Sequence, residues 1–174
     1  MAIVAKAGSG TFVPAPAGAQ AAVCVDVVDN GLIKNDRFKN EDGTDKWQHK
    51  ITVVWESSEK MDSGKPFLIQ KRYTLSLGEK ATLRHDLESW RGKPFTQDEL
   101  DGFDVERLIG VSALLNVVHK AGSKGGTFAN VAAVSPLIRG MAKLEPSGDY
   151  VRVCLRSNQP QDDDAAPSDD DIPF

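Results

Sequence analysis

The alternation of apolar and polar positions divides the chain into short segments with two different periods. Five segments are rich in β-branched and aromatic residues and end near Gly, Pro or Asn, which is typical of strands. These predicted strands span residues 21–30, 47–56, 67–77, 111–120 and 128–137. The first is almost wholly apolar, so it is expected to be buried and to end at Asn30. A sixth, shorter strand is predicted at 148–155.

Two of the predicted strands alternate clearly enough to assign their faces. One face of 47–56 carries Trp47, His49, Ile51, Val53 and Trp55. One face of 67–77 carries Ile69, Lys71, Tyr73, Leu75 and Leu77, and the other carries Gln70, Arg72, Thr74 and Ser76. Each strand is therefore expected to turn one face toward a core.

The period changes to that of a helix in the middle of the chain. The predicted helical pieces span 79–92, 96–103 and 104–110. Leu83, Leu87 and Trp90 are spaced i, i+4 and i+7 in the first piece, which predicts an amphipathic helix that buries all three. Thr96 and Glu99 have the spacing of a capping box, which predicts the start of the second.

The remaining segments are polar or rich in Gly, Pro and Ala. Residues 32–46 are charged and are expected to form a long connection rather than a tight hairpin. Turns are predicted at 57–66 and, in a Gly-rich hairpin loop, at 121–127. The organisation predicted is a flexible segment at 1–20, one domain at 21–155 and a disordered tail at 156–174.

Three strands, a helical insertion and two more strands form the element order of an OB-fold. The predicted fold is therefore mainly β, a five-stranded OB-fold barrel with a helical insertion between strands 3 and 4. Such barrels bind oligonucleotides or oligosaccharides across strands 2–3 and the loops joining strands 1–2 and 4–5, here 30–46 and 120–127. An α+β sandwich of the same elements stays open as an alternative, because element order does not fix strand pairing.

Charge is distributed unevenly along the 174 residues. Residues 1–161 hold all 21 Lys and Arg against 19 Asp and Glu, whereas residues 162–171 hold six Asp and no base. A mildly basic body with a separate acidic tail favours nucleic acid as the ligand of the body and partner binding or competition for the tail.

The sequence also favours a soluble cytoplasmic protein. Cys24 and Cys154 lie in apolar or β-rich stretches without metal-ligand spacing, so both are expected to be reduced and buried. The first twelve residues do not have the pattern of a signal peptide, and no apolar run is long enough to span a membrane. We therefore expect a cytoplasmic location and no membrane partner.

The chain ends in D-D-D-I-P-F, and this ending resembles the C-terminal tip of bacterial single-stranded DNA-binding proteins. The resemblance covers residues 162–174. In that family the terminal Phe and its carboxylate dock into pockets on replication, repair and recombination proteins. The resemblance implies the same partner-binding role for Asp169, Asp170, Asp171, Ile172, Pro173 and Phe174.

The body resembles phage-encoded OB-fold single-stranded DNA-binding proteins rather than the bacterial tetramer-forming domain. The stretch that carries this resemblance is FDVERLIGVSALLNVVHKAGSKGGTFANVAAVSPL, residues 103–137. It implies non-enzymatic, sequence-nonspecific binding of single-stranded DNA in replication, recombination and repair. For a phage protein the location would be the host cytoplasm.

Such binding needs cations along the phosphates and flat side chains that stack on bases. The candidate DNA-binding residues are Lys34, Arg37, Phe38, Lys39, Lys46, Trp47, Lys50, Trp55, Lys71, Arg72, Tyr73, Lys120 and Lys124. Trp55 and Tyr73 share faces with aliphatic residues, so a core position is the alternative for both. Phe38 lies among charges and Trp47 at a strand edge, which makes them the better stacking candidates.

Other chemistry is less well supported by the sequence. The loop AGSKGGT lacks the order of a phosphate-binding loop and precedes a strand, and the three His show no metal-ligand spacing. No catalytic residue, metal or cofactor is therefore expected. A metal-dependent nuclease stays open as an alternative, with acids at Asp26, Asp29, Asp36, Glu41, Asp42 and Asp45. An RNA-binding or pure interaction module is a further alternative.

Overall fold

A computed structural model describes residues 13–156 and contains one antiparallel sheet of five strands with a few short helices. The strands are β1 (Gly18–Lys39), β2 (Asp45–Lys60), β3 (Pro66–Thr74), β4 (Ser112–Ala121) and β5 (Thr127–Ser135). The prediction of a mainly β protein with helices between its third and fourth strands is confirmed. The acidic tail and its tip lie outside the described residues, as does most of the N-terminal segment.

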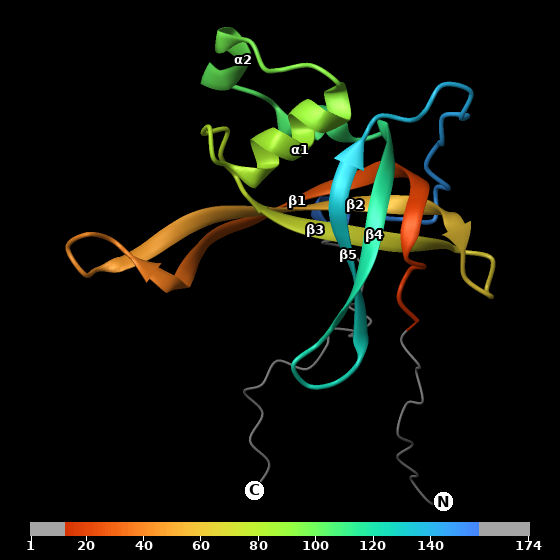
Figure 1. The fold of residues 1–174 in the computed structure, drawn as a ribbon, viewed down its shortest axis with the longest axis horizontal. Coiled ribbons are helices and arrows are strands. Elements are labelled where there is room, and N and C mark those ends of the chain that lie inside the picture. Colours follow the sequence, from red (N-terminus) through yellow and green to blue (C-terminus); the bar gives the residue numbers. More distant parts are fainter. Residues whose placement is uncertain (1–12, 157–174) are drawn as a thin grey trace, which may run out of the picture.

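The sheet is built around β1, which is long enough to pair on both sides. Residues 18–23 pair with β4 and residues 22–39 pair with β2, so the strand order is β3-β2-β1-β4-β5. Residues of the two end strands, β3 and β5, come within 8 Å of each other between Cα atoms. The sheet therefore curls strongly, as Figure 1 shows.

The core lies inside this curl and is closed by a helix. The buried face of β2 carries Ile51, Val53 and Trp55, as its alternation predicts. Helix α1 (Thr82–Arg91) contacts β3 and β5 and buries Leu83, Leu87 and Trp90, which confirms the predicted apolar stripe. The rings of Trp55 and Trp90 lie 5.9 Å apart between centroids, and Trp90 Nε1 donates to the carbonyl of Ser112 at 2.8 Å.

The helical insertion is completed by α2 (Gln97–Asp101) and the 3-10 helix η1 (Val105–Leu108). The capping box predicted for α2 is present: Thr96 Oγ1 accepts from Glu99 N, and a Glu99 carboxylate oxygen accepts from Thr96 N. α1 ends at Gly92, which has φ of 72° and so adopts the left-handed conformation that Gly tolerates best.

Two predicted elements are wrong. Residues 32–46 are not an irregular connection, because β1 and β2 continue through them to a tight turn at residues 40–44. Neither face is buried there, so no apolar alternation marks the strands. Residues 148–155 do not form a sixth strand but an irregular segment that ends in the 3-10 helix η2 (Val153–Leu155).

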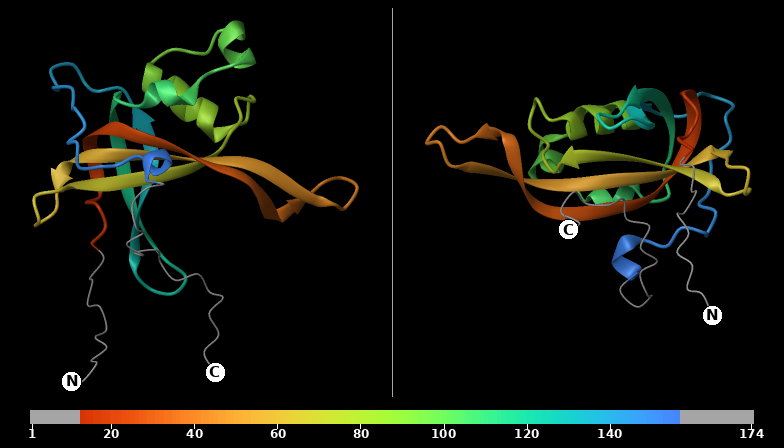
Figure 2. Two further views of the ribbon diagram at one scale, coloured as in Figure 1. Left: turned by 180° about the vertical axis from the view of Figure 1, so that it is seen from behind. Right: turned by 90° about the horizontal axis from the view of Figure 1, so that it is seen from below.

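Residues 141–153 cross the outer face of β1 and β2 (Figure 2), and we call them the strap. Leu144 and Tyr150 of the strap pack against Val23, Val25 and Val54. The strap is therefore part of the folded body and covers one region of the outer sheet face.

Two buried carboxylates fasten the strap. Glu56 accepts hydrogen bonds from Ser147 N and Oγ at 2.8 and 2.9 Å. Asp26 accepts from Tyr150 Oη at 3.0 Å, Arg152 Nε at 3.1 Å and Val153 N at 2.9 Å. Buried carboxylates are normally paired or hydrogen-bonded, and here the strap supplies the partners.

The two cysteines differ in environment, although both are unpaired as expected. Cys24 is buried, and burial raises the pKa of its thiol to about 12. Cys154 is exposed, so the prediction of two buried thiols is wrong for Cys154. In the part of the chain that the structure describes, no helix has the length and apolar character needed to cross a membrane.

Candidate nucleic-acid interface

The distal part of the β1–β2 hairpin projects from the body, and we call its residues 31–50 the arm (Figure 1). Phe38 and Trp47 are 65% and 58% exposed on it. Large aromatic rings gain nothing from exposure to water in the free protein, so two on one projecting element suggest a stacking surface. The arm therefore brings together the two residues that the sequence favours for stacking.

The arm also carries cations, and most of them have no ion-pair partner among the described residues. Within residues 13–156, Arg37, Lys39 and Lys46 have no ion-pair partner. Lys34 is paired instead: its Nζ lies 2.8 Å from Asp45 Oδ2, and this contact raises the pKa of Lys34. Residues 31–50 hold five Lys and Arg against four Asp and Glu, so these unpaired cations give the arm a small positive excess that is compatible with a polyanionic ligand.

A bulge at the end of the arm determines how Arg37 and Phe38 are presented. The ladder passes from Asn35↔Lys46 directly to Lys39↔Asp45, so residues 36–38 bulge out of β1. Asn35 Oδ1 accepts from Arg37 N at 3.0 Å and from Phe38 N at 3.2 Å. Asn35 Nδ2 donates to Gln48 Oε1 on β2 at 3.1 Å, which ties the bulge to the neighbouring strand.

Replacing Asn35 by alanine should loosen this bulge without unfolding the protein. The backbone N–H groups of Arg37 and Phe38 would lose their acceptor, and their amide hydrogen exchange should accelerate several-fold because each such bond contributes about 1 kcal/mol. Exchange at residues of α1 provides the internal control. Unchanged exchange at Arg37 and Phe38 would show that Asn35 does not hold the bulge.

The base of the arm is fixed by a second bulge. The ladder shifts between Asp29 and Gly31, and Gly31 has φ of 70°. Asp29 Oδ1 accepts from Gly31 N at 2.8 Å and pairs with His49 Nε2 at 2.5 Å. The bond to His49, followed by the bond to Gly31, lowers the pKa of Asp29. These contacts fix the direction in which the arm leaves the sheet.

A polar face continues from the arm onto the sheet body. Residues paired across an antiparallel ladder share a face. We call this outer surface of β2 and β3 the polar face; it comprises Lys46, Gln48, Lys50, Thr52, Gln70, Arg72 and Thr74. Lys50 Nζ donates to Thr74 Oγ1 at 2.6 Å, whereas Arg72 is exposed and has no charged partner among the described residues. The strap packs on Val54 at one end of this region, whereas Gln70 and Arg72 are exposed.

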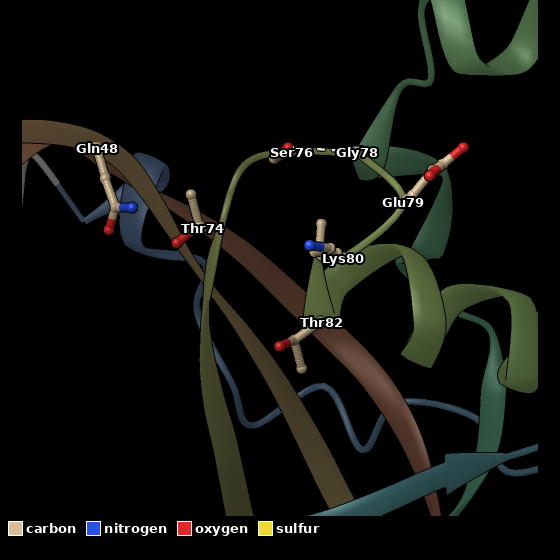
Figure 3. A pocket seen from close by; sticks show the side chains of 8 residues that line it. Gln48, Thr74, Ser76, Gly78, Glu79, Lys80 and Thr82 are labelled. Carbon is tan, nitrogen blue, oxygen red and sulfur yellow. Dashed lines mark hydrogen bonds between the residues drawn. The ribbon is translucent and has the colours of Figure 1, made fainter. Parts of the chain in front are cut away.

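A cavity of about 610 Å³ opens where the polar face meets the helical insertion. Figure 3 shows Gln48 and Thr74 on one side, and Lys80 and Thr82 at the N-terminus of α1 on the other. The N-cap of α1 is Ala81, which supplies no side-chain hydrogen bond to the first turn. Backbone N–H groups without a side-chain cap, next to Lys80, provide an environment that favours a phosphate group.

The remaining predicted DNA-binding residues lie elsewhere. Trp55 and Tyr73 are 1% and 4% exposed in the core, so neither ring is available for stacking and the core alternative holds for both. Lys71 lies 2.7 Å from Asp86 Oδ2, which also accepts from Tyr73 Oη at 2.7 Å. Trp55 is therefore corrected from a ligand contact to a core residue of β2 that packs on Trp90, and Lys71 and Tyr73 are corrected to contacts between β3 and α1.

Lys120 and Lys124 lie on the β4–β5 hairpin, which projects separately from the arm (Figure 1). The sequence prediction omitted Phe128, which pairs with Lys120 in the ladder and is 51% exposed. An aromatic residue directly after the Gly-rich loop was the feature of the sequence that could have identified Phe128 as a candidate. It also omitted Asn35, whose role depends on a bulge that no pattern reveals.

The acids suggested for a nuclease centre do not gather. Asp26 is buried under the strap, whereas Asp42 lies in the exposed turn of the arm and accepts from Thr44. Among residues 13–156, no group of three or more His, Cys, Asp or Glu side chains is arranged to hold a metal ion.

Comparison with known proteins adds no relative: no protein-family model matches the chain, and no curated protein matches it.

Proposed function

We propose that this chain is a non-enzymatic protein that binds single-stranded DNA without sequence preference during replication, recombination and repair. The observation that carries the proposal is the arm, which exposes Phe38 and Trp47 among the unpaired cations Arg37, Lys39 and Lys46. Stacking is sequence-tolerant because every base has an aromatic face, and cations follow the backbone of any sequence.

The fold supports this proposal if the curled sheet is an OB-type barrel. Three observations favour that assignment: β1 pairs with both β2 and β4, the end strands β3 and β5 approach each other, and α1 packs against both. An OB-fold binds its ligand across strands 2–3 and the loops joining strands 1–2 and 4–5. In this chain those places correspond to the polar face, the arm and the β4–β5 hairpin.

The proposed mechanism combines two kinds of contact, ionic contacts with phosphates and stacking on bases. Lys46, Lys50 and Arg72 would neutralise phosphates along the polar face, and Phe38 and Trp47 would each stack on a base. Trp47 lies on the opposite face of the arm from Lys46, because successive strand residues alternate. A bound strand would therefore wrap the arm rather than lie flat on one side of it.

The acidic C-terminal tip is proposed to recruit replication and recombination proteins. This part rests on the sequence of residues 162–174, namely six aspartates and the terminal Ile172, Pro173 and Phe174. The apolar triplet supplies contact area that aspartates lack, and Pro173 limits the conformational freedom that is lost on binding. The same aspartates would compete with phosphates for the cations of the body.

The test compares the full chain with a form that ends at Gln161, using fluorescence anisotropy of labelled single-stranded DNA, duplex DNA and RNA. The full chain should prefer single-stranded DNA, and log K should fall with log salt by about 0.7 per phosphate contacted. The shortened form should bind more tightly at low salt, because six aspartates no longer compete, and this gain should fade at physiological ionic strength as the screening length falls to about 8 Å.

The outcomes separate the alternatives. Equal or weaker binding to single-stranded than to duplex DNA would refute the proposal, whereas stronger binding to RNA would support an RNA-binding module. Recovery of shortened DNA after incubation with Mg²⁺ would support a nuclease. Intact DNA and a salt-dependent preference for single strands are the results expected.

A further inference from the structure

A groove of about 870 Å³ lies where the end strands β3 and β5 approach each other. Its exposed apolar surface comes from Leu68 on β3 and Phe128 on β5, whereas Phe67 and Ile69 border it from the core. The groove is distinct from the cavity at the base of the arm, since the two share no lining residue. Such apolar walls could contact the flat faces of a ligand.

Two side-chain amides line this apolar groove and lack hydrogen-bond partners. Gln70 belongs to β3 and Asn130 to β5, and neither side chain is hydrogen-bonded to another residue within 13–156. Each amide offers both a donor and an acceptor, which is the chemistry that matches the edges of nucleobases. Two amides on facing strands can therefore hydrogen-bond a flat polar ligand held between the apolar walls.

The aromatic wall is positioned by the Gly-rich loop. The ring of Phe128 lies against Gly122, where an added β-carbon would overlap ring atom Cε2. Gly122 therefore allows the ring to take its place at the edge of the groove, where 51% of Phe128 remains exposed. This gives the loop AGSKGGT a packing role in place of phosphate binding.

The charges in the groove do not favour a phosphate as its occupant. Lys60 and Asp62 both line it, so the net charge that they contribute is zero. The groove therefore has no excess positive charge that would favour a phosphate over an uncharged base. Gln70 shares the polar face with Arg72, two residues further along β3, so a strand on that face passes the groove.

We propose that this groove takes one base of the bound single strand, with its faces against the apolar walls and its edge on Gln70 and Asn130. The proposal rests on the proposed function, because the strand must already lie along the polar face. It adds a contact that reads a base, while Lys50 and Arg72 follow the phosphates. The bound strand would consequently extend from the arm to the seam between β3 and β5.

The experiment measures the affinity of the double variant Gln70→Ala/Asn130→Ala for two oligonucleotides of equal length. One is oligo-dT, and the other has the same sugar–phosphate backbone without bases. On oligo-dT the double variant should bind about three- to thirtyfold more weakly, because two hydrogen bonds are lost and water offsets part of the loss. On the abasic oligonucleotide, variant and unaltered protein should bind equally.

The salt dependence supplies a second, independent readout. The double variant should keep the slope of log K against log salt, whereas Arg72→Ala should reduce it by about 0.7 because a phosphate contact is lost. Gln97→Ala is the matched control, since it removes an exposed amide on α2 outside the groove. Thermal unfolding of each variant checks that the fold is kept, and Gln70→Ala alone replaces the double variant if the latter unfolds.

The results distinguish this inference from the function on which it rests. If Arg72→Ala weakens binding but Gln70→Ala/Asn130→Ala does not, the groove takes no base and the proposed function survives. The same outcome is expected if the groove holds an apolar peptide instead. If the unaltered protein does not bind oligo-dT, the proposed function and this inference both fail.

Discussion

A chain in which Phe38 and Trp47 are both replaced by alanine should bind single-stranded DNA at least about thirtyfold more weakly than the unaltered protein. Stacking of a base on an aromatic ring contributes about 1–3 kcal/mol, and both rings are mostly exposed on the arm. Loss of two stacked bases therefore removes at least about 2 kcal/mol of binding free energy. Fluorescence anisotropy at fixed salt measures the change directly.

The control for this double variant lies on the same arm. Leu32 is 67% exposed and pairs with His49 in the ladder, but its side chain has no aromatic face. Leu32→Ala should leave the affinity nearly unchanged, and both variants should retain the salt slope of the unaltered protein because no charge is removed. Equal losses for Leu32→Ala and the aromatic double variant would mean that the arm contributes only its shape.

Sequence periodicity predicted those elements in which a buried face alternates with an exposed one. The face of Ile51, Val53 and Trp55 and the helical stripe of Leu83, Leu87 and Trp90 are both confirmed, because burial imposes a period on the sequence. The capping box at Thr96 was visible for a related reason, since its residue types and spacing are local.

The arm could not be recognised as a hairpin in this way. Its strands are exposed on both faces, so their order comes from backbone pairing and from the bulge that Asn35 holds, neither of which requires an apolar pattern. Its stacking candidates were nevertheless visible, because Phe38 and Trp47 are aromatic residues among charges. Composition therefore identified the surface chemistry where periodicity could not identify the structure.

The groove at the seam and the strap depend on contacts between distant segments. Gln70 and Asn130 are 60 positions apart, and Asp26 receives its partners from residues 150–153. Asp26 was predicted only as a candidate acid in an apolar strand, and the structure shows why that strand tolerates it. No single-sequence pattern links such residues, since their proximity follows from strand order and from the path of the strap.

Replacement of Asp26 by alanine should cause the largest loss of stability that a single substitution outside the apolar core can produce. The side chain is 1% exposed and accepts from Tyr150, Arg152 and Val153, so alanine would leave three donors without their acceptor. We expect the free energy of unfolding to fall by about 2–4 kcal/mol, measured by chemical denaturation. Hydrogen exchange in the strap should rise at the same time.

The matched control removes the exposed end of the same network. Arg152 also contacts Glu106 at 2.7 Å, and the Glu106 side chain is 60% exposed. Glu106→Gln should therefore change the free energy of unfolding by less than about 1 kcal/mol, as exposed ion pairs generally do. Similar losses for Asp26→Ala and Glu106→Gln would contradict the view that the buried carboxylate fastens the strap.

The stability of the protein should also depend on pH through Asp26. Burial alone would raise the pKa of this carboxyl, but hydrogen bonds from Val153 N, Arg152 and Tyr150 together lower the pKa below its ordinary value of 3.8. The contribution of the carboxylate is therefore complete above that ordinary value and is lost as the pH falls through the lower pKa of the folded state. Between pH 7 and pH 3 the unaltered protein should consequently lose more stability than Asp26→Asn, whose side chain does not titrate. Because all other carboxyls are common to both proteins, an equal loss in the two would show that Asp26 is not responsible for the acid sensitivity.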